Sequence, residues 1–292
     1  MQILDGIQLA KEIKNEIKSL VESYTAQGKR APHLGAILVG NNGASRTYVD
    51  NKIKDCNFVG FESSELILPD TISQEELIAE IVRWNNDDNL DGFIVQLPLP
   101  KHIDQEAVIN AIDPNKDVDG FHPTNFGKMA LEMDTFLPAT PYGIMEMLAR
   151  YEVPTAGKHT VVIGRSRIVG RPMSILMSKN GNPGNSTVTL THSKTEDLAK
   201  YTKEADIVIT ALGVPEFLKA DMIKDGAVIV DVGITRVDDP TSPKGFKLAG
   251  DVDFENVKEK ASWITPVPGG VGPMTRAMLL KNTLLAYHNN NK

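Results

Sequence analysis

Short apolar runs that end in glycine or proline alternate with amphipathic segments along most of this chain. In the first half, the apolar runs predict three strands, at 34–40 (LGAILVG), 64–69 (SELILP) and 91–100 (DGFIVQLPLP). Residues spaced three and four apart predict helices over the first 27 residues, at 45–59 and at 73–85, and the last of these opens with the S-x-x-E spacing of a capping box. Strands that alternate with helices indicate βαβ units, which build a parallel sheet.

A second alternating series follows residue 140, where Thr140 and Pro141 fit the N-cap and first positions of a new helix. Its strands and intervening helices are predicted at 159–164, near 170–179, at 187–192, near 194–203, and at 205–213 and 226–233. At about 100–200 residues per domain, two such series in 292 residues predict two domains. We expect one α/β domain over 1–142, completed by a C-terminal helix at 273–292, and a Rossmann-like nucleotide-binding domain with a parallel sheet over 143–272.

The composition is that of an ordinary globular protein and argues against several classes of function. A net charge of −7 is unfavourable for a general nucleic-acid binder, which needs a basic surface. No apolar run approaches the ~18 residues of a membrane span, and the N-terminal residues are too charged for a secretory signal, so we expect a cytoplasmic protein with no membrane partner. The six histidines show no metal-ligand spacing, so no metal is expected. Cys56, the single cysteine, lies in an apolar helical stripe and is expected to pack rather than react.

The segment VVIGRSRIVGRP (161–172) lies where a nucleotide-binding fold places its phosphate loop, between a strand and a helix. Gly164 ends the strand and Gly170 begins the helix, whose N-terminal N–H groups and dipole attract phosphate. The usual G-x-G-x-x-G pattern is incomplete, because Ser166 stands where the second glycine is expected. Taken alone, the segment is therefore also compatible with a tight turn that binds no ligand.

The strand that follows this loop bears on the choice between NAD and NADP. NAD sites use a carboxylate near the end of that strand to bind the ribose 2′-hydroxyl. Here TVTLTH (187–192) is followed by Ser193 and Lys194, and no acid occurs in the first three positions after the strand. Because Arg165 also lies just past the first glycine, the pattern suits a 2′-phosphate and predicts NADP. His192 has a simpler interpretation as a structural residue at the strand end.

The stretch TYVDNKIKD places two lysines on the second predicted helix, and spacing explains only one of them. Lys54 follows Asp50 by four residues, acid first, which is the favourable order for a surface ion pair. Lys52 has Tyr48 at the corresponding position, so its neighbour on the helix face is a phenol. An ion pair between Lys52 and Asp55 remains open, and periodicity alone does not decide whether Lys52 has a function.

Six motifs carry a resemblance that extends over almost the whole chain. They are YVDNK (48–52), VQLPLP (95–100), KDVDGF (116–121), GRSRIVGRP (164–172), THSKT (191–195) and TPVPGGVGPMT (265–275). In this order they closely resemble the bifunctional methylenetetrahydrofolate dehydrogenase/methenyltetrahydrofolate cyclohydrolase family. KDVDG and the last motif are highly specific in combination, and no room is left for the formyltetrahydrofolate synthetase domain that some relatives append. The turn at 179–186 looks longer than usual and GFHPTNFGK differs in its middle, so we expect altered loops rather than altered chemistry.

The resemblance assigns roles to individual residues. The implied catalytic residues are Tyr48, Lys52, Gln96 and Asp119. The implied cofactor contacts are Gly164, Arg165, Ser166, Ser193 and Ile234. The implied folate contacts are Tyr48, Lys52, Val95, Gln96, Leu97, Asp119, Pro268, Gly269, Gly270, Val271 and Gly272. Simpler interpretations stay open, in which Gln96 caps the sheet edge, Asp119 is a turn residue, and PVPGGVGP only leads into a helix.

The resemblance also implies a two-step reaction of one-carbon metabolism in a cleft between the two domains. NADP⁺ takes a hydride from 5,10-methylenetetrahydrofolate, and water then opens the resulting methenyl cation to give 10-formyltetrahydrofolate. The second step needs a group that exchanges protons near neutral pH, and burial beside Gln96 would lower the pKa of Lys52 from the ~10.4 of a free lysine. Tyr48 would stack on or orient the pterin, and Asp119 would accept hydrogen bonds from its amino-pyrimidine edge. The expected partners are reduced folates, with or without a polyglutamate tail, and a second copy of the chain in a homodimer.

Three rival functions compete with the bifunctional enzyme. A dehydrogenase without the second activity would be expected to have lost Lys52 or Gln96, and a non-catalytic NADP sensor would show a degraded folate half. Another two-domain oxidoreductase, such as one acting on a hydroxy acid, would lack KDVDG and PGGVGP together. The chain retains all of these features, which favours the bifunctional enzyme.

Overall fold

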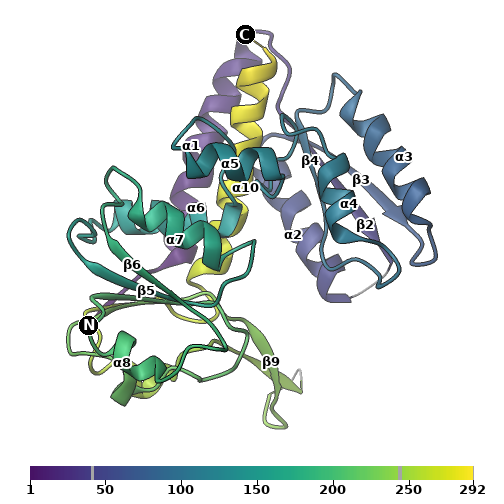
Figure 1. The fold of residues 1–292 in the computed structure, drawn as a ribbon. Helices are drawn as coiled ribbons and strands as arrows, with labels where there is room; N and C mark the ends of the chain where they lie inside the picture. Colours follow the sequence, from purple (N-terminus) through teal and green to yellow (C-terminus); the bar gives the residue numbers. More distant parts are fainter. Residues whose placement is uncertain (41–42, 243–244, 292) are drawn as a thin grey trace. The chain divides into compact units, whose positions relative to one another are not determined.

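The computed structural model describes residues 1–40, 43–242 and 245–291, and the chain divides into two compact units. We name the units by their sheets. The six-stranded unit consists of Met1–Ala10 and Thr140–Thr275, and the three-stranded unit consists of Lys11–Ala139 and Arg276–Lys292. Two helices contribute residues to both units, α1 (Gly6–Ala26) and α10 (Val271–Asn290), as Figure 1 shows.

The first ten residues differ in placement from the expected division. The sequence analysis assigned them to the N-terminal domain, whereas they belong to the six-stranded unit. The reason is a two-residue strand, β1 (Gln2–Ile3), which pairs in parallel with β11 (Trp263–Ile264). Within the three-stranded unit, α1 and α10 lie side by side, and the ring of Tyr24 stacks on that of Tyr287 with 5.8 Å between centroids (Figure 1).

Three parallel strands form the smaller sheet, in the order β3-β2-β4. They are β2 (His33–Val39), β3 (Glu62–Leu68) and β4 (Gly92–Val95). The accompanying helices are α2 (Gly43–Val59), α3 (Gln74–Asn85), α4 (Gln105–Ala111) and α5 (Pro123–Ala130). The predicted strands and the two predicted helices of this region are present, and α3 begins with the predicted capping box, in which Ser73 Oγ accepts from Glu76 N and the Glu76 carboxylate accepts from Ser73 N.

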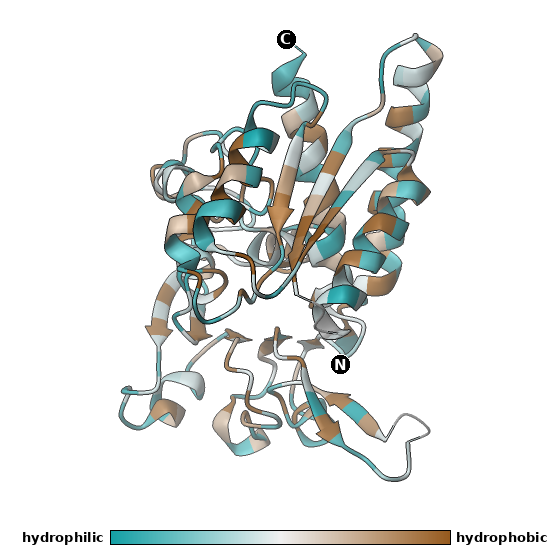
Figure 2. Ribbon diagram, turned by 90° about the vertical axis from the view of Figure 1, so that its right-hand side faces the viewer, coloured by the Kyte–Doolittle hydropathy of each residue, from teal (hydrophilic) through white to brown (hydrophobic). Residues whose placement is uncertain are grey.

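Apolar strands in this sheet are explained by the helices that cover it. Residues of β2 and β4 form one buried core cluster with α3 and α4, which includes Ile37, Val39, Leu77, Ile81, Trp84, Phe93, Val95 and Val108. The rings of Trp84 and Phe93 meet edge to face, 5.5 Å apart. A side chain at Gly35 would collide with Trp84, because a Cβ there would lie 2.4 Å from Cζ3. Figure 2 shows apolar residues both along the strands and on the helices, and β2 and β4 are buried over nearly their whole length, whereas β3 is partly exposed.

Six parallel strands form the larger sheet, in the order β1-β11-β8-β7-β5-β6. The remaining four are β5 (His159–Ile163), β6 (Thr187–Thr191), β7 (Ile207–Thr210) and β8 (Val228–Asp231). Its helices are α6 (Ala139–Arg150), α7 (Gly170–Ser178), α8 (Leu198–Thr202) and α9 (Phe254–Val257), with a 3₁₀ turn at Ala220–Met222. β6 lies on one side of β5 and β7 on the other, and open α/β sheets bind ligands at such a switch point, outside the carboxyl ends of the strands.

Several elements differ from the prediction. α6 begins at Ala139, so Thr140 lies inside the first turn instead of capping it, and α8 is shorter than the predicted helix at 194–203. Helices α4 and α5 and the antiparallel hairpin β9–β10 (Thr235–Asp238 and Phe246–Ala249) were not predicted, because elements this short show little periodicity. In the part of the chain that the structure describes, no helix is both long enough and apolar enough to cross a membrane.

Asp91 connects three parts of the three-stranded unit. Its fully buried carboxylate accepts two hydrogen bonds from the Arg30 guanidinium, at 2.7 and 2.6 Å, and one from His33 N at 2.8 Å. The Arg30 guanidinium also lies over the ring of Tyr287 on α10, 5.1 Å from the centroid. This bidentate pair therefore joins the start of β4 to β2 and to the C-terminal helix.

Replacing Asp91 by alanine should lower the free energy of unfolding by about 2 kcal/mol, because the partly exposed Arg30 guanidinium and the His33 N–H would both lose their acceptor. Urea denaturation followed by circular dichroism measures the change. Asp88→Ala is the matched control, since Asp88 lies three residues earlier and is exposed. A loss below about 1 kcal/mol for Asp91→Ala would show that the pair contributes no more than a surface ion pair.

Candidate active site

Lys52 contacts Gln96 in the three-stranded unit. Lys52 lies on α2, Gln96 directly follows β4, and Lys52 Nζ donates a hydrogen bond to Gln96 Oε1 at 3.2 Å. The amide of Gln96 is oriented by a second bond, in which Nε2 donates to Leu97 O at 2.7 Å. Gln96 N donates to Ile37 O at 2.8 Å and so extends the pairing of β4 with β2. The acceptor facing Lys52 is therefore an uncharged oxygen in a fixed position.

The surroundings of Lys52 favour its neutral form. Burial lowers the pKa of Lys52, and the Asp119 carboxylate opposes this to a smaller extent because it stabilises the charged amine. Burial also raises the pKa of Asp119, against a smaller opposite effect of Lys52. Three residues that were predicted from separate motifs, Lys52, Gln96 and Asp119, thus interact within one unit.

The acids next to Lys52 in the sequence have other partners. Asp50 Oδ1 pairs with Arg46 Nε at 2.9 Å, so the predicted ion pair between Asp50 and Lys54 is wrong. Asp55, which remained open as a partner of Lys52, pairs with cations from two other helices, Lys14 at 2.9 Å and Arg276 at 3.3 Å. The only hydrogen bond that the described residues offer to Lys52 Nζ is therefore the one to Gln96.

Tyr48 and Cys56 lie one turn before and one turn after Lys52 on α2. Tyr48 is 46% exposed, so its ring is accessible on the same flank of the helix as Lys52. Cys56 is fully buried, and burial raises the pKa of its thiol to about 12. A thiol that is buried and protonated is unreactive, which agrees with the packing role predicted for Cys56.

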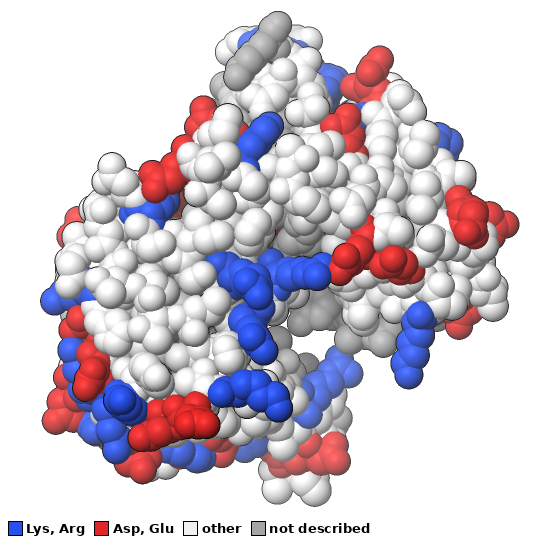
Figure 3. All heavy atoms as spheres, in the orientation of Figure 1, with Lys and Arg blue, Asp and Glu red and all other residues white. Residues whose placement is uncertain are grey.

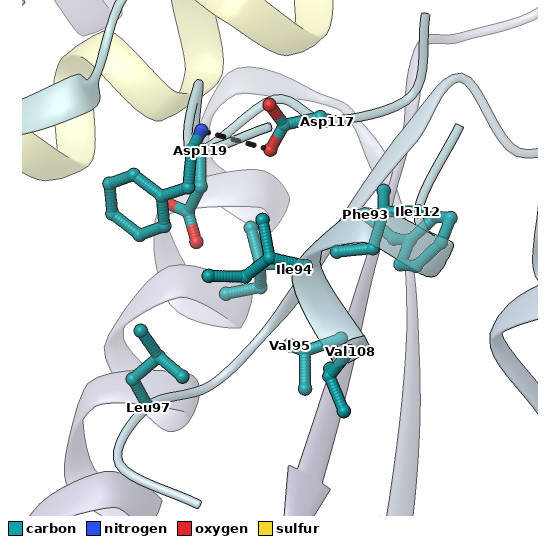
Figure 4. Close-up of a pocket in the computed structure, with 10 residues that line it drawn as sticks. Phe93, Ile94, Val95, Leu97, Val108, Ile112, Asp117 and Asp119 are labelled. Carbon is teal, nitrogen blue, oxygen red and sulfur yellow. Dashed lines mark hydrogen bonds between the residues drawn. The ribbon is translucent and has the colours of Figure 1, made fainter. Parts of the chain in front are cut away.

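Asp119 lines a small pocket beside β4, drawn in Figure 4. Apolar side chains of β4 and α4 form most of its wall, namely Phe93, Ile94, Val95, Val108 and Ile109, together with Ile112 after α4. Leu97, Phe121 and the carboxylates of Asp117 and Asp119 complete the lining (Figure 4). The pocket thus brings together Val95, Leu97 and Asp119, which the sequence analysis assigned to folate binding.

Asp117 was not predicted as part of the site, although it is the first acid of the KDVDG motif. Its buried carboxylate accepts hydrogen bonds from Phe121 N at 3.2 Å, His122 N at 2.7 Å and Asn125 Nδ2 at 2.9 Å. Burial raises its pKa to about 7, against the lowering effect of these bonds. Asp117 therefore fixes the turn that carries Asp119, and the regular spacing of two acids in the motif was the signal that the sequence analysis left unused.

The segment Pro268–Gly272 belongs to the six-stranded unit, where it leads into α10. The backbone is closely packed here, because a Cβ at Gly6 would lie 1.7 Å from Gly270 O. Gly269 has φ +116°, a conformation that side chains disfavour, and Gly270 N donates to Pro266 O at 2.8 Å. Gly269 and Gly270 are therefore required by the local fold, because a Cβ at Gly270 would also lie 2.7 Å from Thr265 Cβ, whereas a Cβ at Gly272 would meet nothing within 4 Å.

The phosphate loop of the six-stranded unit has the tight geometry expected of a nucleotide site. Gly164 has φ +114°, and a Cβ there would lie 2.4 Å from Ala211 O in the loop after β7. A Cβ at Gly170 would lie 1.9 Å from Gly164 O, so the helix start approaches the strand end closely. Ser166 Oγ accepts from Val169 N at 3.1 Å and Gly170 N at 3.3 Å, so it caps α7 and uses part of the N-terminal donor set that was expected to be free.

The loops after β5 and β6 lie next to each other at the carboxyl edge of the sheet. Gly164 N donates to Thr191 O at 3.0 Å, which places Arg165 and Ser193 on adjacent exposed loops without an acid between them. His192 Nδ1 accepts from Lys194 N at 3.2 Å, so His192 shapes this turn, as its structural interpretation predicted. Ile234, after β8, is 49% exposed.

Charged side chains are unevenly distributed over the surface. Figure 3 shows basic side chains gathered together on the face that it draws, although the net charge of the chain is −7. In the six-stranded unit, exposed cations of the phosphate loop include Arg165 and Arg171. Within residues 1–40, 43–242 and 245–291, no group of three or more His, Cys, Asp and Glu residues is arranged to hold a metal ion.

Comparisons with known proteins agree with the division into a substrate part and a nucleotide part. Residues 4–119 match the family model for the tetrahydrofolate dehydrogenase/cyclohydrolase catalytic domain. Residues 138–291 match the model for the NAD(P)-binding domain of the same family. Bifunctional protein FolD of Flavobacterium johnsoniae is 69% identical over 286 residues, which are 98% of this chain and 97% of that protein.

Solved structures resemble the whole chain. The bifunctional methylenetetrahydrofolate dehydrogenase/cyclohydrolase FolD from Campylobacter jejuni has a TM-score of 0.93 at 47% identity and covers 99% of both chains. The corresponding enzyme of Trypanosoma brucei, solved with NADP cofactor and an inhibitor, has a TM-score of 0.93 at 39% identity and covers 99% of this chain and 97% of its own. The likeness therefore extends over both units at identities that indicate common descent.

The amine of Lys52 should titrate below the ~10.4 of a free lysine, because burial disfavours its charged form. The Asp119→Asn variant should titrate lower still, since Asp119 stabilises the ammonium. Competitive acetylation at a series of pH values, read at Lys52 by mass spectrometry, measures both midpoints. The same measurement in urea is the control, because unfolding returns the amine to water. A Lys52 midpoint in the folded protein that equals the one in urea would contradict this reading of the site.

Proposed function

Because this chain belongs to the tetrahydrofolate dehydrogenase/cyclohydrolase family, we propose that Lys52 is the proton-transfer group of its cyclohydrolase reaction. The enzyme oxidises 5,10-methylenetetrahydrofolate to 5,10-methenyltetrahydrofolate with NADP⁺ and hydrolyses the methenyl product to 10-formyltetrahydrofolate. The observation that carries the proposal is the hydrogen bond from Lys52 Nζ to the neutral Gln96 oxygen, in surroundings that lower the pKa of Lys52.

The hydrolysis requires a base that is neutral at working pH. Water attacks the one-carbon bridge of the methenyl cation, a carbon–oxygen bond forms, and the neutral Lys52 amine takes the proton that the water loses. The bond from that carbon to N5 then breaks, and Lys52 returns the proton to N5. The hydroxyl proton of the intermediate goes to solvent as the formyl group forms, so that one proton is released overall. A cationic intermediate near Lys52 would lower its pKa further, because like charges disfavour protonation.

Gln96 suits this cycle because it is uncharged. Its oxygen holds Nζ in place by accepting a hydrogen bond, and this hydrogen bond remains available when Lys52 is neutral as well as when it is charged. A carboxylate at the same position would stabilise the ammonium and raise the pKa of Lys52. The orienting bond from Gln96 Nε2 to Leu97 O keeps the amide oxygen turned toward the lysine.

Folate binding is proposed for the residues around this pair. Tyr48 would place its exposed ring against the pterin, and Asp119 would accept hydrogen bonds from the amino-pyrimidine edge. Val95 and Leu97 line the pocket next to Asp119 and would exclude water from the reacting centre. We assign a further part of the folate site to Pro268–Gly272, on the resemblance of that motif alone.

The phosphate loop supplies the proposed cofactor contacts. Gly164 and Gly170 allow the end of β5, the start of α7 and the loop after β7 to pack closely, because a Cβ at either position would collide with backbone atoms, and a tight turn of this kind between a strand and a helix fits a pyrophosphate, with Ser166 shaping the helix start. Arg165 and Ser193 would hold the 2′-phosphate of NADP, and Ile234 would contact the nicotinamide part. When bound, NADP⁺ accepts a hydride from the one-carbon bridge, and the chain contributes mainly positioning to that step.

A homodimer and a cytoplasmic location are two further proposals. The resemblance to a family that commonly forms dimers through its nucleotide domain supports the homodimer, and the similarity to bifunctional FolD proteins supports the cytoplasmic location. We also propose that reduced folates with a polyglutamate tail are accepted as well as those without one. Light scattering after size-exclusion chromatography measures the mass in solution, and a monomer at micromolar concentration would refute the dimer.

Lys52→Met should abolish hydrolysis of methenyltetrahydrofolate, with a fall of at least about a hundredfold in rate, because no group remains to move the proton. The loss of methenyl absorbance measures this directly. Lys54→Met is the matched control, since Lys54 is exposed on the same helix and should leave the rate unchanged. NADPH formation from methylenetetrahydrofolate should persist in Lys52→Met, and hydrolysis that survives in this variant would refute the role of Lys52.

Arg165→Ala should weaken the preference for NADP⁺ over NAD⁺. The expected change is about tenfold in the ratio of the two kcat/KM values, equal to about 1.4 kcal/mol, because one cation that pairs with the 2′-phosphate is lost. Initial rates of methylenetetrahydrofolate oxidation with each cofactor give the ratio. Lys203→Ala, at an exposed lysine after α8, is the control for a general loss of positive charge. An unchanged ratio in Arg165→Ala, or a wild-type enzyme that prefers NAD⁺, would contradict the assignment.

A further inference from the structure

Two buried carboxylates lie at the carboxyl edge of the six-stranded sheet and have no part in the chemistry proposed above. Asp231 ends β8, and Asp251 follows the hairpin strand β10. Their exposed fractions are 3% and 0%. In the part of the chain that the structure describes, neither forms an ion pair with Lys, Arg or His, and their hydrogen-bond donors are mainly backbone N–H groups.

Asp251 holds the loop that follows β7. Its Oδ2 accepts from Leu212 N at 2.6 Å and its Oδ1 from Val214 N at 2.9 Å. This loop lies at the switch point of the sheet, where a Cβ at Gly164 of the phosphate loop would touch Ala211 O. Asp251 therefore determines the shape of one wall of the proposed NADP site.

Asp231 holds the segment that carries Asp251. Its Oδ1 accepts from Asp251 N at 3.0 Å and its Oδ2 from Val252 N at 2.9 Å. The same Oδ1 accepts from Gly233 N at 2.9 Å, one residue before Ile234. Thr210 Oγ1 at the end of β7 donates to it at 3.2 Å. The loops after β7, β8 and β10 are thus connected through two side chains.

The packing around these carboxylates leaves no freedom for a looser arrangement. A Cβ at Gly233 would lie 2.2 Å from Asp251 Oδ1, and a Cβ at Gly250 would lie 2.0 Å from Asp231 Oδ2. Thr235 Oγ1 donates to Gly213 O at 3.5 Å, so the loop after β8 also contacts the loop after β7. Each of these two loops carries an exposed apolar residue, Val214 in the loop after β7 and Ile234 in the loop after β8.

Buried carboxylates close to a site for a phosphorylated ligand are unfavourable in two ways. They lose hydration, which raises the pKa of Asp231 to about 6, and they repel an anion. A buried carboxylate that accepts several backbone N–H bonds, however, specifies one loop conformation. These bonds would therefore hold the loop at 211–214 in one conformation before the ligand binds.

We propose that Asp251, supported by Asp231, is a positioning residue for NADP, which fixes the loop at 211–214 and the turn before Ile234 in the conformation that receives the cofactor. This inference rests on the proposed NADP site. The carboxylates do not touch the reacting atoms, and they act through the backbone of Leu212, Val214 and Gly233.

The test compares Asp251→Asn with Asp238→Asn, a matched control at an exposed acid on the hairpin strand β9. Asparagine retains one acceptor and presents an N–H group to the second donor, so one of the two loop bonds is lost. NADPH affinity, measured by fluorescence titration without folate, should fall about tenfold in Asp251→Asn and stay unchanged in Asp238→Asn. Hydrogen exchange at the amides of Leu212 and Val214 should become faster.

Cyclohydrolase activity measured without nucleotide provides the internal reference. It should be retained in Asp251→Asn, because the proposed proton-transfer pair lies in the other unit. The proposal would be overturned if Asp251→Asn bound NADPH as tightly as the wild type although hydrogen exchange at Leu212 and Val214 had become faster. It would also be overturned if hydrogen exchange at these two amides did not change. If Asp251→Asn does not fold, the Thr210→Val variant provides the test, because it removes only one hydrogen-bond donor to Asp231. A threefold or larger loss of NADPH affinity in Thr210→Val would support the proposal, and an unchanged affinity would overturn it. A wild-type protein that fails to bind NADPH would instead refute the proposed function.

Discussion

Every strand of the two sheets runs parallel to its neighbours, and this constraint places Gln96 and the proposed cofactor contacts. Parallel strands end at the same edge, so the residues that follow them collect there. Gln96 follows β4 in one unit, and in the other unit Gly164, Ser193 and Ile234 follow β5, β6 and β8. The antiparallel hairpin β9–β10 lies outside these sheets, and it brings Asp251 back to the edge where the parallel strands end.

Much of the architecture could be predicted from local sequence patterns, because the strands and most of the helices are determined by short runs of residues. The central strands of both sheets, the helices α2, α3 and α7 and the capping box of α3 agree with the prediction. The exceptions depend on contacts between residues far apart in the chain. β1 is a strand only because Trp263 and Ile264 lie beside it, and no periodicity can reveal a two-residue element.

The candidate site shows the same limit at the level of side chains. Helical spacing assigned Asp50 to Lys54 as its partner, and this is wrong because Arg46 competes for Asp50 and spacing does not rank competitors. The motifs indicated Lys52, Gln96 and Asp119, and the structure shows how these three interact. Asp251 was missed because its partners are backbone N–H groups, which have no signature in the sequence, whereas the spacing of two acids in KDVDG was an unused signal for Asp117.

The pairing of β1 with β11 also has a consequence for protein synthesis. Residues 2 and 3 are translated well before the strand that they pair with, which is complete only at residue 264. At translation rates of about 5–20 residues per second, this edge of the sheet stays open for tens of seconds. During that interval β1 has no strand partner, so the six-stranded sheet is completed only when nearly the whole unit has been made.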